Sequence, residues 1–237
     1  MLYLENGLSP ENVVRAVLEA TNRAVLNTGI EARLILCTLR HFSELQGLVT
    51  ARLLERFKDT RVAALDLAGD EAGFPLEAHI PAFEFAIEHD IPRIAHAGEA
   101  AGPESIWAVL EHLKPSRIGH GVRSIEDPLL VDTLRRRNIH LEVCPTCNVQ
   151  IDLYEQYGDH PIDHLYRLGI PLSVNTDARA TTPTTLSADY RHLAETFGWG
   201  MPEFLASNVQ AVRASFAPPD LKRALLQRLK QGYVRKK

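Results

Sequence analysis

Ile94-Ala95-His96-Ala97-Gly98-Glu99 is the stretch that decides the fold, because a short apolar run ends in a histidine, a glycine and a glutamate. Two further stretches place polar residues after an apolar run in the same way, Arg117-Ile118-Gly119-His120-Gly121 and Asn175-Thr176-Asp177. Such runs indicate buried strands, and the carboxyl ends of parallel strands meet at one face of a barrel. Histidine, glutamate and aspartate gathered there are typical of a metal-dependent hydrolase.

The rest of the chain alternates strand and helix patterns. Strands are expected at 32–37, 62–67, 92–96, 117–120, 140–144 and 171–175, and helices at about 10–28, 47–58, 78–89, 104–113, 127–137, 162–168, 185–197, 202–215 and 220–232. This alternation predicts right-handed βαβ units and a parallel sheet. The 237 residues contain no visible linker and approach the length of about 250 that a (β/α)₈ barrel needs. We therefore expect one domain over 1–237, with an open doubly wound sheet as the alternative.

Composition argues against several kinds of partner and compartment. Lys and Arg number 26 against 30 Asp and Glu, a net charge of −4, so neither nucleic acid nor an anionic membrane is expected to bind. Three cysteines do not make a disulfide framework and indicate a reducing compartment. No signal peptide and no long apolar run is apparent in the sequence. We expect a cytoplasmic protein whose partner is a small molecule.

The strand-end residues favour a site as a set, although a single histidine in such a place is usually structural. Gly98 lets the backbone turn sharply, so that His96 and Glu99 can face one cavity. A histidine ligand beside a carboxylate suits a metal-activated water and a proton shuttle. His120 lies between two glycines, and Asp177 could bind a metal or accept a proton.

Three other features have simpler interpretations. The acidic residues of Gly69-Asp70-Glu71 could equally belong to a site or cap the next helix. Cys144-Pro145-Thr146-Cys147 could be a redox motif or half of a zinc site, but a loop with incidental thiols near the site is the better interpretation. The remaining histidines are expected mostly at the surface: His41, His79, His89, His112, His140, His160, His164 and His192.

In the order of these motifs the chain resembles the adenosine deaminase family. The matching stretches, in sequence order, are Asp66-Leu67-Ala68-Gly69-Asp70-Glu71, His96-Ala97-Gly98-Glu99, Ile118-Gly119-His120-Gly121, Glu142-Val143-Cys144-Pro145 and Ser173-Val174-Asn175-Thr176-Asp177. The resemblance covers essentially the whole chain. It implies a (β/α)₈ barrel with one zinc ion at the carboxyl end and the conversion of adenosine and water to inosine and ammonia.

The resemblance also implies a role for each site residue. His96 and Asp177 would be zinc ligands, and Glu99 would protonate the purine ring nitrogen as water attacks the adjacent carbon. His120 would orient the zinc-bound hydroxide and stabilise its charge. The backbone N–H of Gly69 would contact the purine. Further residues expected to line the site are Asp66, Asp70 and Cys147.

The sequence departs from the family pattern in two places. No His-x-His pair occurs in the 237 residues, whereas the family's first strand supplies two zinc ligands in that form. The first strand here then corresponds to the third of the family, so we expect strands 3–8 of an N-terminally truncated barrel, followed by additional C-terminal helices. Ala178 stands where the family often has a second aspartate that recognises a purine nitrogen.

These departures leave alternatives for zinc, substrate and activity. With two of its ligands missing, the zinc ion is expected to bind weakly or not at all. The chain could be a catalytically inactive homologue or binding protein, or a deaminase of another aminopurine such as adenine or aminodeoxyfutalosine. Open barrel edges predict self-association.

Overall fold

The computed structural model describes residues 7–234, which divide into two compact units. Unit 1 comprises residues up to 95 together with 108–115, and unit 2 comprises 96–107 together with 116 onward. In chain order the elements are α1 (Pro10–Thr28), β1 (Leu34–Leu39), α2 (Glu44–Arg56), β2 (Val62–Ala68), η2 (Glu77–His79), α3 (Ile80–Glu88), β3 (Ile94–Ala97), α4 (Pro103–His112), β4 (Arg117–His120), η3 (Val122–Glu126), α5 (Pro128–Arg137), β5 (His140–Val143), α6 (Pro145–Gln150), η4 (Tyr157–Asp159), α7 (Ile162–Arg167), β6 (Leu172–Val174), α8 (Leu186–Phe197), α9 (Met201–Ala214) and α10 (Pro219–Val234).

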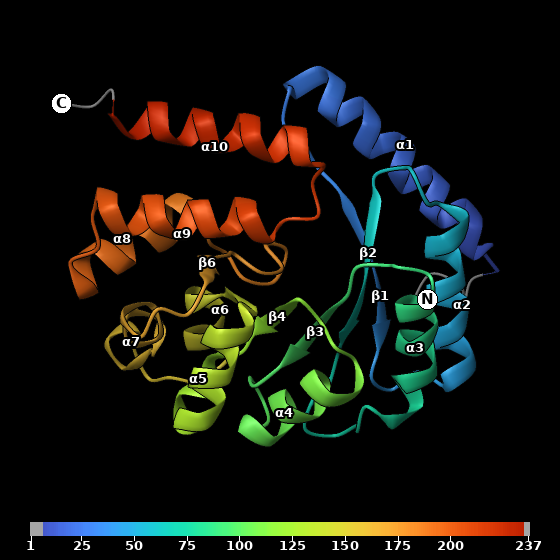
Figure 1. The fold of residues 1–237 in the computed structure, drawn as a ribbon, viewed down its shortest axis with the longest axis horizontal. Helices are drawn as coiled ribbons and strands as arrows, with labels where there is room; N and C mark the ends of the chain where they lie inside the picture. Colours follow the sequence, from blue (N-terminus) through green and yellow to red (C-terminus); the bar gives the residue numbers. More distant parts are fainter. Residues whose placement is uncertain (1–6, 235–237) are drawn as a thin grey trace. The chain divides into compact units, whose positions relative to one another are not determined.

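Unit 1 is organised around the parallel pair β1 and β2 (Figure 1). The pair runs in register from Ile35 opposite Ala64 to Leu39 opposite Ala68. Helix α2 packs on both strands and on α3, and it begins with a capping box in which Ser43 and Gln46 satisfy each other's backbone N–H groups. The capping box explains why α2 starts three residues earlier than its apolar pattern predicts.

Unit 2 contains β4, β5, β6 and the second half of β3, whose carboxyl ends carry four of the five motifs. The four-stranded sheet has the order β3-β4-β5-β6, with β4 parallel to β5 and β5 parallel to β6. Helix α9 packs against β6, and α10 lies along α9 (Figure 1). The predicted α/β class with parallel strands and C-terminal helices is therefore confirmed.

Several predicted details were wrong. Residues 145–150 form α6 rather than a loop, because Pro145 at its first turn has the backbone angle that starts a helix. His79, His140 and His160 are buried, with at most 3% of their surface exposed, rather than at the surface.

Within residues 7–234, no helix has both the length and the apolar character that a membrane crossing requires.

Candidate active site

Unit 2 brings together the polar residues at the carboxyl ends of its strands. His96 lies on β3 and Glu99 follows that strand, while His120 ends β4. Cys144 comes directly after β5, and Asp177 follows β6. The sequence placed four of these residues at one edge, and the structure adds Cys144 to them.

Three of these side chains form a group that could hold a metal ion. His120, Cys144 and Asp177 each offer a ligand atom, and the three atoms lie within 4.8 Å of one another. His120 Nε2 is 3.9 Å from Asp177 Oδ2, and the His96 ring lies 5.4 Å from the His120 ring between centroids. Nitrogen, sulfur and oxygen donors are the ligands that zinc takes in proteins, so the residues present fit such an ion.

Glycines allow the close packing behind these ligands. A Cβ added to Gly119 on β4 would lie 2.8 Å from Cγ of His96, so only glycine lets that ring lie against the strand backbone. Gly98 has a φ of 70°, and a Cβ there would meet the Ile106 side chain at 2.3 Å. Both positions therefore require glycine, as the turn argument from the sequence predicted for Gly98.

Two of the candidate ligands have backbone angles that residues other than glycine seldom adopt. His120 has a φ of 59° and Asp177 a φ of 57°. Such left-handed residues cost free energy and concentrate at functional sites, where the surrounding structure holds them in place. The Asp177 carboxylate also accepts a hydrogen bond from the backbone N–H of Ala178 at 2.7 Å, which ties its side chain to its own turn.

Glu99 is held by two side chains of the same unit. Its Oε1 lies 3.1 Å from Nδ1 of His120 and accepts a hydrogen bond from Nδ2 of Asn148 at 2.5 Å. The carboxylate favours the His120 tautomer with its hydrogen on Nδ1, which leaves a lone pair on Nε2. That is the form in which histidine binds a metal, with a carboxylate behind it.

Asn148 is in turn held by His160. Nδ1 of His160 accepts the backbone N–H of Ile162 at 3.1 Å, so its Nε2–H donates to Oδ1 of Asn148 at 3.2 Å. Burial, with a smaller effect of nearby His120, lowers the pKa of His160 to about 3, and its ring is neutral at physiological pH. A fixed chain of hydrogen bonds thus runs from the backbone to Glu99.

Asn148 and His160 are parts of the site that the sequence did not predict. The available signal for Asn148 was its position four residues after Cys144, one helical turn into α6. No spacing rule relates His160 to Asn148, because the two come together only through the tertiary fold.

Cys147 lies beside the candidate ligands, as expected. Burial, together with a hydrogen bond to the Asp177 carboxylate, raises the pKa of its thiol to about 12. The thiol is therefore protonated at neutral pH and is a poor nucleophile. Burial likewise raises the pKa of Cys144, so neither thiol of Cys144-Pro145-Thr146-Cys147 has the lowered pKa that is typical of a redox motif.

The other residues predicted to line the site belong to unit 1. Asp66 is buried on β2, and Gly69 follows that strand with a φ of 97°. Asp70 is exposed, and its Oδ1 accepts the backbone N–H of Gly73 at 2.8 Å. This local bond favours the turn-capping interpretation of Asp70 over a direct role in chemistry.

Both the sequence and the structure of the chain are similar to those of known proteins. The family model described as adenosine deaminase matches residues 1–232. Adenosine deaminase 1 of Streptomyces coelicolor is 35% identical over 98% of this chain, and adenine deaminase of Mesorhizobium japonicum is 37% identical over 94% of it. The crystal structure of adenine deaminase from Arthrobacter aurescens superposes with a TM-score of 0.90 at 28% identity over 97% of this chain.

The chain spans only part of each relative. It covers 62% of the Streptomyces protein, 69% of the Mesorhizobium protein and 70% of the Arthrobacter structure. Over that span the superposition supports the barrel fold in partial form and rules out the open doubly wound sheet. By sequence and by fold, the chain belongs to the adenosine deaminase family.

Proposed function

We propose hydrolytic deamination of a 6-aminopurine as the reaction of this site. The observation that carries the proposal is the Glu99 carboxylate, held by Asn148 and His120 next to the donor group of His120, Cys144 and Asp177. A fixed carboxylate beside a metal position is the arrangement that general acid–base hydrolysis needs. Relatives named as adenosine and adenine deaminases support the same reaction class.

We propose a division of roles among the residues of unit 2. His96 and Asp177 are the residues that would hold a zinc ion, with Cys144 as a third donor. Zinc bound there would lower the pKa of a water molecule and so supply a nucleophile at neutral pH. Glu99 delivers a proton to the purine ring nitrogen. His120 orients the attacking oxygen and stabilises its charge.

We propose adenosine as the substrate, with water consumed and inosine and ammonia released. Adenine is the second candidate, because a relative at 37% identity bears the name adenine deaminase and Ala178 offers no carboxylate for purine recognition. The residues of unit 2 described above act on the amino-bearing ring, which the two substrates share.

The test combines zinc content with turnover. The full chain is loaded with zinc, its metal content is measured by mass spectrometry, and adenosine and adenine are followed separately by absorbance. We expect the Glu99→Gln variant to lose turnover by at least about 100-fold while retaining zinc, since general acid catalysis contributes about 10²–10⁴. Glu84→Gln, an exposed glutamate on α3, is the matched control.

Each outcome has a defined meaning. Stoichiometric zinc without turnover of either purine would reject the proposed reaction and favour a binding protein. Retained turnover in Glu99→Gln would remove Glu99 from its role. Turnover of adenine alone would assign the site to the second candidate.

A further inference from the structure

A cavity of about 250 Å³ lies in unit 2 near the amino ends of the strands. Ser116 precedes β4, His140 begins β5 and Pro171 precedes β6, whereas the candidate active-site residues follow the opposite ends of these strands. Helices α9 and α10 contribute Arg213 and Lys222 to its wall. Because a water molecule takes about 30 Å³ of liquid volume, the cavity has room for several waters or one small ligand.

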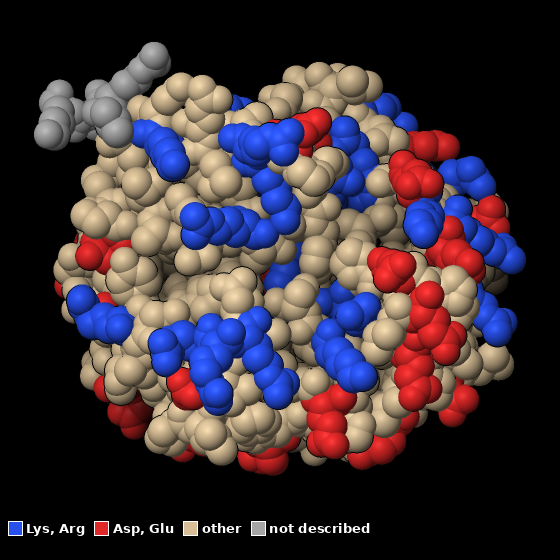
Figure 2. Space-filling view, viewed as in Figure 1, with Lys and Arg blue, Asp and Glu red and all other residues tan. Residues whose placement is uncertain are grey.

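The charge of this cavity is one-sided. None of the described residues that line it is acidic, whereas Arg213 and Lys222 are cationic. Lys222 donates one hydrogen bond to the backbone oxygen of Arg213 at 2.9 Å, and its ammonium group has two further N–H donors. Figure 2 shows Lys and Arg side chains gathered over α9 and α10, with few Asp or Glu among them.

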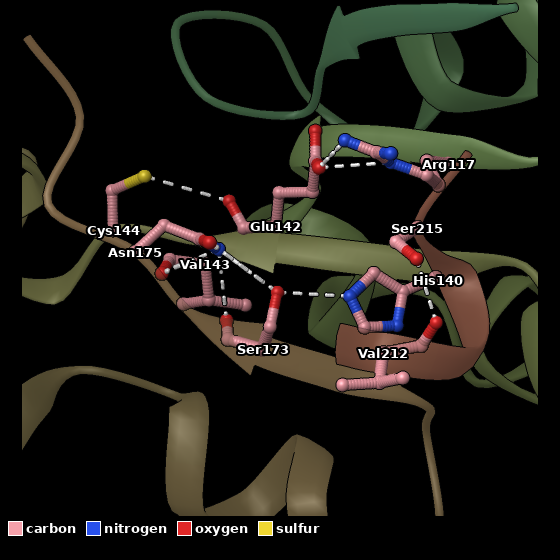
Figure 3. Close-up of polar contacts among 9 residues, drawn as sticks. All are labelled: Arg117, His140, Glu142, Val143, Cys144, Ser173, Asn175, Val212 and Ser215. Carbon is pink, nitrogen blue, oxygen red and sulfur yellow. Dashed lines mark hydrogen bonds and ion pairs between the residues drawn. The ribbon is translucent and has the colours of Figure 1, made fainter. Parts of the chain in front are cut away.

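His140 contributes a buried nitrogen that lacks a partner. The side chain is 3% exposed, and its Nε2 pairs with Oγ of Ser173 at 2.8 Å. Its Nδ1 has no hydrogen-bond partner among residues 7–234. Figure 3 shows this nitrogen on the side of the ring that faces Val212 and Ser215, away from Ser173. An orphaned polar atom of this kind is rare and costly unless something occupies the space beside it.

Arg117 adds positive charge at the same end of the strands. Its guanidinium pairs with Glu142 and lies 4.4 Å from the ring centre of Phe216, a residue of the cavity wall. Burial and the charge of Arg117 lower the pKa values of both His140 and Lys222. Because Glu142 balances Arg117, the charges that a bound anion would offset are those of Arg213 and Lys222.

We propose that this cavity binds a small oxyanion of the phosphate class. Arg213 and Lys222 supply the charge, and the hydroxyl of Ser116 supplies a further donor from the wall. The ligand is either free phosphate or the phosphate group of a monoester. This site is separate from the proposed deaminase chemistry and does not depend on it.

Calorimetric titration of the full chain tests the proposal, with inorganic phosphate in one arm and ribose 5-phosphate in the other. We expect saturable binding in at least one arm, and the tighter arm identifies the source of the phosphate group. Lys222→Gln and Arg213→Gln should each weaken that binding about tenfold, because each removes a charge-assisted hydrogen bond. Lys230→Gln, an exposed substitution on α10 outside the cavity wall, should bind like the original chain.

A second measurement places the anion beside His140 without mutating it. In a chain with ¹⁵N-labelled histidine, saturating phosphate should shift the ring-nitrogen resonances of His140 and leave those of exposed His112 unchanged. Absence of saturable binding in both arms would overturn the proposal. So would equal affinity in Lys222→Gln, Arg213→Gln and the original chain, or an unperturbed His140 ring at saturation.

Discussion

Replacing Asn148 with alanine would remove two hydrogen bonds at once. The side chain is fully buried, its Nδ2 donates to Glu99 and its Oδ1 accepts from His160. Loss of Oδ1 leaves the Nε2–H of His160 as an unpaired buried donor, which costs about 1–3 kcal/mol. The Glu99 side chain is 23% exposed, so water partly replaces the lost donor. The loss of the hydrogen bond to Glu99 therefore costs about 1.5 kcal/mol. We therefore expect Asn148→Ala to lower the free energy of unfolding by about 2.5–4.5 kcal/mol.

Urea denaturation measures this change as a lower midpoint with an unchanged slope. A double-mutant cycle with His160→Ala separates the two shares, because His160 no longer suffers from the loss of Oδ1 once its ring is gone. The coupling between the two substitutions should be about 1–3 kcal/mol. Asn12→Ala, on the exposed side of α1, is the control and should change stability by about 0.5 kcal/mol or less. A cost below about 1 kcal/mol for Asn148→Ala, or additive single effects, would refute the hydrogen-bond chain.

Three further predictions follow from other contacts. Gly119→Ala should weaken zinc binding, because the new Cβ would displace the His96 ring. Circular dichroism should show unchanged secondary structure. Unchanged zinc affinity would show that the His96 ring is not a ligand. Burial holds the pKa of His140 at about 3, below its unfolded value of about 6.5. Between these two pH values the unfolded chain binds more protons than the folded chain. The free energy of unfolding therefore falls as the pH drops through this range, by up to about 1.4 kcal/mol per pH unit. His140→Gln should reduce the pH dependence of stability at pH 4–6 by that amount and leave the contribution of His160, whereas exposed His112→Gln should not change it. Zinc should raise the melting temperature of the original chain more than that of Asp177→Asn, and equal shifts in a thermal scan would exclude Asp177 as a ligand.

Local pattern predicted the strands and the residues at their ends well. Apolar runs and turn glycines placed His96, Glu99, His120 and Asp177 at the ends of strands, and the shared direction of parallel strands then brings them to one side. Element ends were less accurate, since β1 begins at Leu34 rather than two residues earlier. Boundaries depend on backbone pairing with another segment, which no single stretch of sequence reveals.

Burial of histidine was the main failure of the sequence analysis. His140 meets Ser173 33 residues away, and His160 meets Asn148 12 residues away, so both partners are supplied by the tertiary structure. Histidine is found both at the surface, bonded to water, and in the interior, bonded to another polar group. The position of a histidine in the sequence does not show which of the two environments it occupies. Hydrophobic periodicity therefore predicted the fold but not the hydrogen-bond chain behind Glu99.

Polar side chains of β5 and β6 form a hydrogen-bonded network within the sheet. Side chains alternate along a strand, so His140 and Glu142 share one face of β5, and Ser173 stands opposite Glu142 on β6. Ser173 joins His140 to Asn175, which lies two residues before Asp177 (Figure 3). Buried polar side chains are costly unless each is paired, and the atom of this network without a partner among the described residues is Nδ1 of His140. The network is therefore satisfied at Ser173 and Asn175 and open at His140, which is the end where we place the anion.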